Sequence, residues 1–131
     1  MRRIGAAACV ATLVVVATLP ACAQNLVIDT TAANSPFAVT AGNQTFANII
    51  VGNTTTGTLN QSGGTLTANG GVFDLRIGAN GGASGIVNLT GGVLTADQVA
   101  IGSAAGATST FNLNGGRISA GQLATQGGTS T

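Results

Sequence analysis

The sequence contains no histidine, lysine, glutamate, tryptophan or tyrosine, and only 5% of its 131 residues are charged. Without histidine and lysine, it lacks the side chains that most often serve as general bases or amine nucleophiles. Without tryptophan and tyrosine, it lacks the aromatic platforms on which sugar-binding surfaces usually depend. We therefore expect no catalytic, cofactor or metal site, and the residue types that remain for chemistry are Ser, Thr, Arg and Asp.

The small number of charges also argues against electrostatic partners. The formal net charge is +1, but Arg2 and Arg3 stand at the very start of the chain. The remainder holds two arginines and three aspartates, a net charge of −1. Such a surface has no field that would attract nucleic acid or anionic lipid, so we expect no nucleic-acid partner.

The first 23 residues have the layout of a secretory signal peptide. Arg2 and Arg3 are followed by an uncharged stretch rich in Ala and Val over residues 4–19, and then by Ala21-Cys22-Ala23. Small residues at those positions predict cleavage between Ala23 and Gln24. The apolar stretch is shorter than the roughly 20 residues of a membrane span. We expect export to the cell surface, the outer membrane or the medium.

An alternative processing route involves the second cysteine. Leu19-Pro20-Ala21-Cys22 resembles a bacterial lipobox, in which the cysteine carries lipid and becomes the first mature residue, although Pro20 is unusual there. Both cysteines, Cys9 and Cys22, lie in the leader. Cleavage after Ala23 would leave no thiol, which excludes disulfides and cysteine-based metal sites from the mature chain.

A doubled glycine followed by a short apolar–polar segment occurs three times, at Gly63-Gly64, Gly91-Gly92 and Gly115-Gly116. The steps between copies are 28 and 24 residues, and an insertion around residues 69–73 explains the longer one. Self-similarity at such a period is the signature of a repeat architecture. We divide the mature chain into residues 24–47, an N-terminal cap or irregular first coil, and residues 48–131, about three repeat coils plus a truncated fourth.

Two further positions recur with the same period. An Ile-Gly or Val-Gly pair ends the first segment of each unit, and an asparagine lies within the second. The glycines are Gly52, Gly78 and Gly102, and the asparagines are Asn60, Asn88 and Asn112. We expect the asparagines to stack as a structural amide ladder.

Each unit contains three segments of about four residues with period-two alternation, bounded by Gly or small polar residues. Three short strands per coil of about 24 residues predict an all-β fold, a parallel β-helix (β-solenoid), without helices in the mature chain. The apolar positions would point inward, with Gln61 as the one polar exception. The glycine pairs would form corners where φ is positive or a Cβ has no room.

A single coil cannot bury its own apolar face, so both ends of such a stack need cover. The last residues, Gly127 to Thr131, stop in the turn that would lead into another second segment. We therefore expect a fragment of a longer array, which would self-associate through its uncapped C-terminal coil.

The phrases from Ile77 to Asn88 and from Gly91 to Thr95 resemble autotransporter-associated β-strand repeats, which also occur in exported bacterial proteins with a PEP-CTERM sorting signal. The resemblance covers residues 48–131. It implies a passenger-like β-solenoid displayed at, or released from, the cell surface. Neither a C-terminal membrane barrel nor a PEP-type sorting segment is evident in this sequence.

These features favour a non-enzymatic, structural or adhesive surface protein whose partner is unknown, with polysaccharide or other cells as candidates. One alternative is a fragment of a polysaccharide-active β-helix enzyme whose site lies on coils missing from this sequence. Such an enzyme needs paired carboxylates, and within this sequence Asp74 and Asp97 would at best be near neighbours on adjoining coils. We instead interpret Asp29, Asp74 and Asp97 as solvated corner residues. A second alternative is an ice- or mineral-binding solenoid, suggested by the row of Thr65, Thr67 and Thr95.

Overall fold

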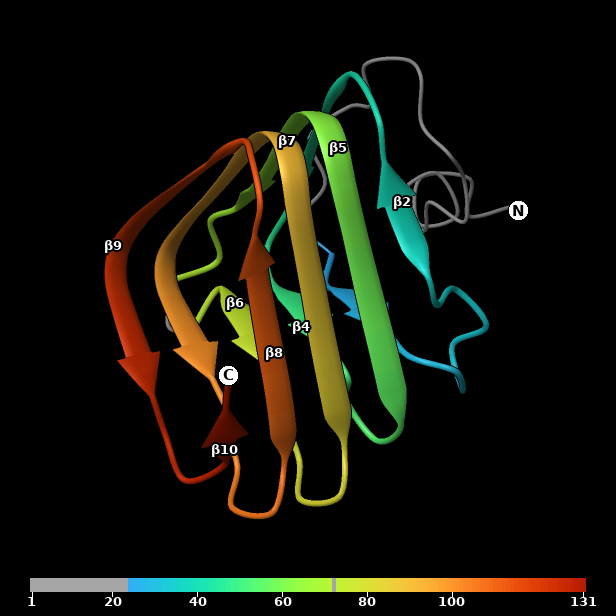
Figure 1. Cartoon of the computed structure of the whole chain (residues 1–131), viewed down its shortest axis with the longest axis vertical. Helices are drawn as coiled ribbons and strands as arrows, with labels where there is room; N and C mark the ends of the chain where they lie inside the picture. The colour runs from blue at the N-terminus through green and yellow to red at the C-terminus, as the bar shows by residue number, and fades with distance from the viewer. Residues whose placement is uncertain (1–23, 72) are drawn as a thin grey trace, which may run out of the picture.

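The computed structural model describes residues 24–71 and 73–131 (Figure 1). The expected leader, both cysteines and the Ala23 side of the expected cleavage site lie outside the described residues. Within those residues the secondary structure is entirely strand and turn, as the repeat pattern predicts, and no helix is long and apolar enough to cross a membrane.

Ten strands join in one sheet that winds around the molecule. In chain order they are β1 (Leu26–Ile28), β2 (Phe37–Val39), β3 (Asn43–Phe46), β4 (Ile49–Val51), β5 (Thr56–Ala68), β6 (Leu75–Ile77), β7 (Ser84–Ile101), β8 (Thr108–Leu113), β9 (Arg117–Thr125) and β10 (Thr129–Ser130).

All of the strand pairs are parallel and join equivalent segments of successive coils, which confirms the predicted parallel β-solenoid with coils of about 24 residues. The first side of the coil is built by β1, β4, β6 and the ends of β7 and β9. The second side contains β2, β8, β10 and parts of β5 and β7. The third contains β3 and further parts of β5, β7 and β9. Figure 1 shows β2, β5, β7 and β8 of the second side next to one another.

The doubled glycine forms the corner between the second and third sides. At Gly91 an added Cβ would lie 2.3 Å from the carbonyl oxygen of Ser62 in the preceding coil. Gly92 has a φ of +78°, in a region that a side chain disfavours. The first glycine thus permits close approach of two coils and the second permits the turn. Strand pairing shifts in register at this corner and resumes at Thr65 and Val93, so β5 and β7 are long strands that each span two sides of the coil.

The core consists of inward-pointing side chains that stack from coil to coil. One column runs Leu26, Ile49, Leu75, Val99 and Leu123, and another runs Phe37, Leu59, Val87 and Phe111. Apart from the terminal Phe111 and Leu123, these side chains are buried. Gln61 is buried among them, as predicted, and its Nε2 donates a hydrogen bond to the carbonyl of Val93 at 2.8 Å.

Residues 26–46 form a coil of their own in register with the next. The strands expected at residues 26–28 and 37–39 are present as β1 and β2. The sequence pattern missed β3, because Asn-Gln-Thr-Phe lacks apolar alternation. Pairing with Thr65–Ala68 in β5 holds this segment extended and buries Gln44.

Candidate functional site

The outward surface of the second side carries an unbroken amide ladder. Asn88 Nδ2 donates to Asn60 Oδ1 at 2.8 Å, and Asn112 Nδ2 donates to Asn88 Oδ1 at 2.7 Å. The parallel register pairs the three residues directly. Asn88 therefore donates to one neighbour and accepts from the other. The outer surface presents identical groups on three successive coils at the spacing of the coils, about 4.8 Å.

The third side carries a column of hydroxyl groups. Thr45, Thr67, Thr95 and Ser119 follow one another in register on β3, β5, β7 and β9. The neighbouring outward column is mixed, since it contains Asn43, Thr65, Val93 and Arg117. The flat threonine array considered for an ice-binding surface is thus one column wide, and the column beside it is interrupted.

Two shorter ladders were not recognised from the sequence. Asn48 Nδ2 donates to Asn25 Oδ1 at 2.8 Å, and Asn80 Nδ2 donates to Asn53 Oδ1 at 3.0 Å. These pairs are 23 and 27 residues apart, so the recurrence of asparagine near the repeat period was the available signal. Variable corner lengths between coils hid it.

Asp29 is buried, contrary to the expectation of a solvated corner, and is held by donors from two coils. Its Oδ1 accepts from Thr31 Oγ1 at 2.6 Å and from the Ala32 amide at 2.8 Å, and its Oδ2 accepts from the amide and hydroxyl of Thr54, each at 3.3 Å. Burial by itself raises the pKa of Asp29, but these hydrogen bonds outweigh it and hold the pKa below its ordinary value. The carboxylate therefore fixes the turn after β1.

Asp74 is also buried, so the expectation of a solvated residue is wrong here too, whereas Asp97 is exposed as expected. The amide of Asp97 donates to Asp74 Oδ2 at 3.0 Å, while Asp74 Oδ1 has no partner. The corner between Ala68 and Leu75 is longer than the equivalent corner between Ala96 and Val99. The inserted residues precede Asp74 directly, and this extra length was the one sign that its corner differs from the others.

Ser109 is a buried residue that the sequence interpretation did not single out. It stacks on Gly85 of the preceding coil. Its hydroxyl donates to the Ile77 carbonyl at 2.7 Å and accepts from the Gly102 amide at 2.9 Å. The corner glycines Gly52, Gly78 and Gly102 all have positive φ, between 66° and 75°. Ser109 therefore ties together two successive copies of the Ile-Gly corner.

The described residues contain no cluster of three or more Asp, Glu, His or Cys side chains that could hold a metal ion. Two outward columns repeat uncharged groups along the solenoid axis, amides on the second side and hydroxyls on the third. Comparison with protein-family models, with curated proteins and with solved structures gives no match to this chain.

Proposed function

We propose that this chain is an exported, non-enzymatic surface protein in which the β-solenoid serves as a structural or adhesive element. The resemblance of residues 48–131 to autotransporter-associated repeats and the signal-peptide layout of residues 1–23 support export to the cell surface or beyond.

The observation that carries the proposal is the regular array of uncharged polar groups on two sides of the coil. The ladder of Asn60, Asn88 and Asn112 repeats an amide on three successive coils. The column that contains Thr67 and Thr95 places a hydroxyl group on every coil. A partner that itself repeats, such as a polysaccharide chain, could form equivalent hydrogen bonds at each step. Many weak contacts at fixed spacing give avidity without a deep pocket.

Binding of the labelled full chain to a panel of polysaccharides and to intact bacterial cells tests this function. We expect Thr95→Arg and Asn88→Arg, which place a bulky charge in the arrays, to reduce binding. Ala105→Arg, at an exposed corner outside both arrays, is the matched control. Equal binding by all three variants would refute the adhesive role of the arrays.

Enzymatic activity is tested on the same preparation. Cleavage of a polysaccharide that is abolished by Asp74→Ala or Asp97→Ala would overturn the proposal in favour of a β-helix enzyme. Export is tested by the mass of the protein recovered from outside the cytoplasm. A mature N-terminus at Gln24 supports the secretory route, a lipid-modified Cys22 supports the lipoprotein route, and an intact leader inside the cell contradicts both.

A further inference from the structure

Three asparagines of this chain are followed directly by glycine, at Asn69-Gly70, Asn80-Gly81 and Asn114-Gly115. Asparagine before glycine is the sequence at which a chain most readily loses a side-chain amide, because the glycine has no Cβ to keep its backbone nitrogen away from the asparagine side chain. The reaction needs water and no partner. The conformation of each pair therefore decides whether it proceeds.

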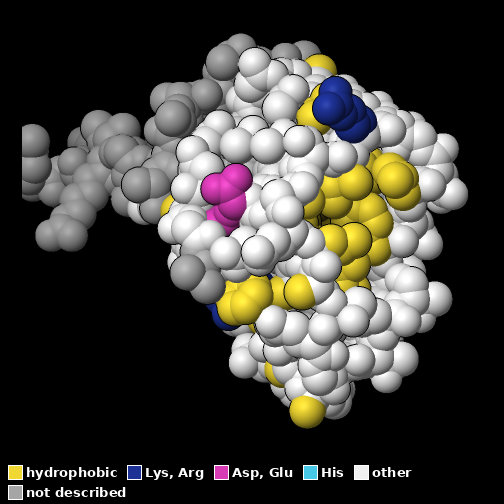
Figure 2. Space-filling model, turned by 90° about the vertical axis from the view of Figure 1, so that its left-hand side faces the viewer, with side chains coloured by type: hydrophobic (Ala, Val, Ile, Leu, Met, Phe, Trp, Pro, Cys, Tyr) yellow, Lys and Arg dark blue, Asp and Glu magenta, His cyan; other side chains and the backbone are white. Residues whose placement is uncertain are grey.

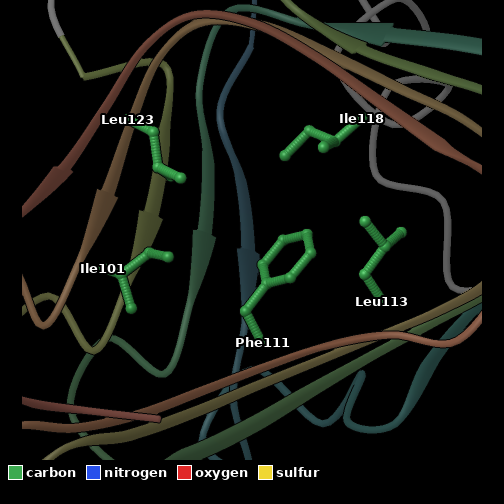
Figure 3. A pocket seen from close by; sticks show the side chains of 5 residues that line it. All are labelled: Ile101, Phe111, Leu113, Ile118 and Leu123. Carbon is green, nitrogen blue, oxygen red and sulfur yellow. The ribbon is translucent and has the colours of Figure 1, made fainter.

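The third pair lies in the last described coil. That coil ends in an apolar hollow, which Figure 2 shows on this face of the molecule. Figure 3 shows the side chains that line it, Ile101, Phe111, Leu113, Ile118 and Leu123. A further coil would cover this hollow and change the surroundings of Asn114. The other two pairs follow β5 and β6, which are paired on both edges, so we compare Asn69 with Asn80.

Asn80 is held at both groups that would have to move. Its Nδ2 donates to the Asn53 carbonyl at 2.8 Å and to Asn53 Oδ1 at 3.0 Å. Its own carbonyl accepts from the Ala83 amide at 3.0 Å. Attack of the Gly81 nitrogen on the Asn80 side chain would turn the peptide group between them and break the bond to Ala83. Loss of Nδ2 would break both bonds to Asn53.

Asn69 lacks these contacts. It follows the last residue of β5, and its side chain is exposed. Its amide donates to the Phe46 carbonyl at 3.2 Å. Among the described residues, however, neither the side chain nor the carbonyl of Asn69 makes a hydrogen bond. The two groups that must move are therefore unrestrained by hydrogen bonds.

The two glycines themselves are confined in a similar way. A Cβ added at Gly70 would lie 2.4 Å from the Ala47 carbonyl oxygen, and one added at Gly81 would lie 2.8 Å from the Ala105 carbonyl oxygen. Each glycine is also followed by a second, exposed glycine. The hydrogen bonds of the asparagine are thus the main difference between the two pairs.

We propose that Asn69 is a site of spontaneous deamidation in the folded protein, and that the fold protects Asn80. The Gly70 nitrogen loses its proton and forms a bond to Cγ of Asn69, which closes a succinimide ring. The Cγ–Nδ2 bond breaks, and Nδ2 takes up a proton and leaves as ammonia. Water then opens the ring at one of its two C–N bonds, which leaves aspartate or isoaspartate at position 69.

The product adds a negative charge to the corner between Ala68 and Leu75. This corner already contains Asp74, which is buried and has no partner at Oδ1. The described side chains, two arginines and three aspartates, would change from a net charge of −1 to −2. The amide ladder and the hydroxyl column lie on the second and third sides, away from this corner, so the inference does not depend on the proposed adhesive function.

Peptide mapping by mass spectrometry tests the inference on the full, folded chain during incubation at mildly alkaline pH. Trypsin cleavage after Arg76 separates Asn69 from Asn80, and labelling by an isoaspartate methyltransferase identifies the rearranged product. We expect deamidation at Asn69 to be at least about tenfold faster than at Asn80, a difference of about 1.4 kcal/mol in the barrier. Asn69→Gln should abolish the product in its peptide.

The same incubation in concentrated urea is the control for local sequence. Without the fold, both asparagines should react at similar rates. Asn53→Ala removes one acceptor of Asn80 Nδ2 and should speed the reaction at Asn80 by about fivefold, with Asn69 unchanged.

Three results would overturn the inference. They are an Asn69 that reacts in urea but stays intact in the folded chain, equal rates at Asn69 and Asn80 in the folded chain, and a rate difference that persists in urea. An Asn53→Ala chain with an unaltered rate at Asn80 would overturn the protective role of the bond between Asn80 and Asn53 Oδ1.

Discussion

The amide of Asp97 donates a hydrogen bond to Oδ2 of Asp74 at 3.0 Å, across the boundary between two successive coils. The donor residue is exposed and the acceptor side chain is completely buried. The second oxygen of Asp74 has no partner. Asp29, by contrast, is buried with donors at both oxygens. Two buried aspartates of one solenoid are therefore solvated by the protein to very different degrees.

Asp74→Asn should leave the free energy of unfolding unchanged or raise it by up to about 1 kcal/mol at pH 7, because a poorly compensated buried charge is removed. The amide oxygen of the asparagine can still accept from the Asp97 amide. Urea unfolding followed by circular dichroism measures the effect, with Asp97→Asn at the exposed neighbour as the control. A loss of more than about 1 kcal/mol would show that the Asp74 charge is stabilising.

Asp29→Asn should have the opposite effect and lower the free energy of unfolding by about 2 kcal/mol, since hydrogen bonds to a charged acceptor are lost. In the unmodified chain the Thr54 amide and hydroxyl donate to Asp29 Oδ2. An asparagine Nδ2 in the place of Oδ2 would face these donors with its own N–H groups. If Asp29→Asn and Asp74→Asn changed the free energy of unfolding by the same amount, the hydrogen bonds at Asp29 would not explain the stability of that site.

The stability of the protein should also depend on pH through Asp29. Its folded-state pKa lies below the ordinary value of 3.8, so folding favours the ionised form. The stability that it contributes is complete above that ordinary value and is lost as pH falls through the folded-state pKa. In Asp29→Asn the decline of the free energy of unfolding below about pH 4 should be shallower. Identical acid profiles for the two proteins would contradict this assignment.

The repeat in the sequence predicted which side chains of each strand point inward and which point outward. Leu66 and Leu94 point inward and Thr67 and Thr95 outward because parallel stacking preserves the alternation of each strand. It did not predict the burial of Gln44, Asp29 or Asp74. Strand pairing with the next coil buries Gln44 in spite of its polarity, and the burial of Asp29 and Asp74 arises at corners of unequal length. Contacts of that kind depend on the conformation of individual turns, which a single sequence with low complexity does not specify.

The doubled glycine provides a test of close approach between coils. Gly91→Ala would place a Cβ 2.3 Å from the Ser62 carbonyl oxygen, a backbone atom that cannot turn away. We expect a loss of about 3 kcal/mol, as for overpacking in a rigid core. Gly82→Ala is the matched control, because Gly82 has a φ of +82° but no atom within 4 Å of the added Cβ.

The control should lose only about 1 kcal/mol, the cost of a left-handed conformation for a residue with a side chain. Denaturation midpoints measure both variants. A Gly91→Ala chain that fails to fold while Gly82→Ala folds is the same result in its extreme form. Equal midpoints would show that the approach of the preceding coil costs little at position 91, because Gly91, unlike Gly82, has no left-handed φ to strain.

The amide ladder predicts a graded response along the solenoid. Asn88 hydrogen-bonds to both Asn60 and Asn112, whereas Asn112 makes one such bond. At roughly 1 kcal/mol for each net hydrogen bond, Asn88→Ala should cost about twice as much as Asn112→Ala. Asn114→Ala, at an exposed position just after β8, should change the free energy of unfolding by less than about 0.5 kcal/mol. If Asn88→Ala and Asn112→Ala were equally costly, the loss would reflect strand propensity at each site and not the bonds between the coils.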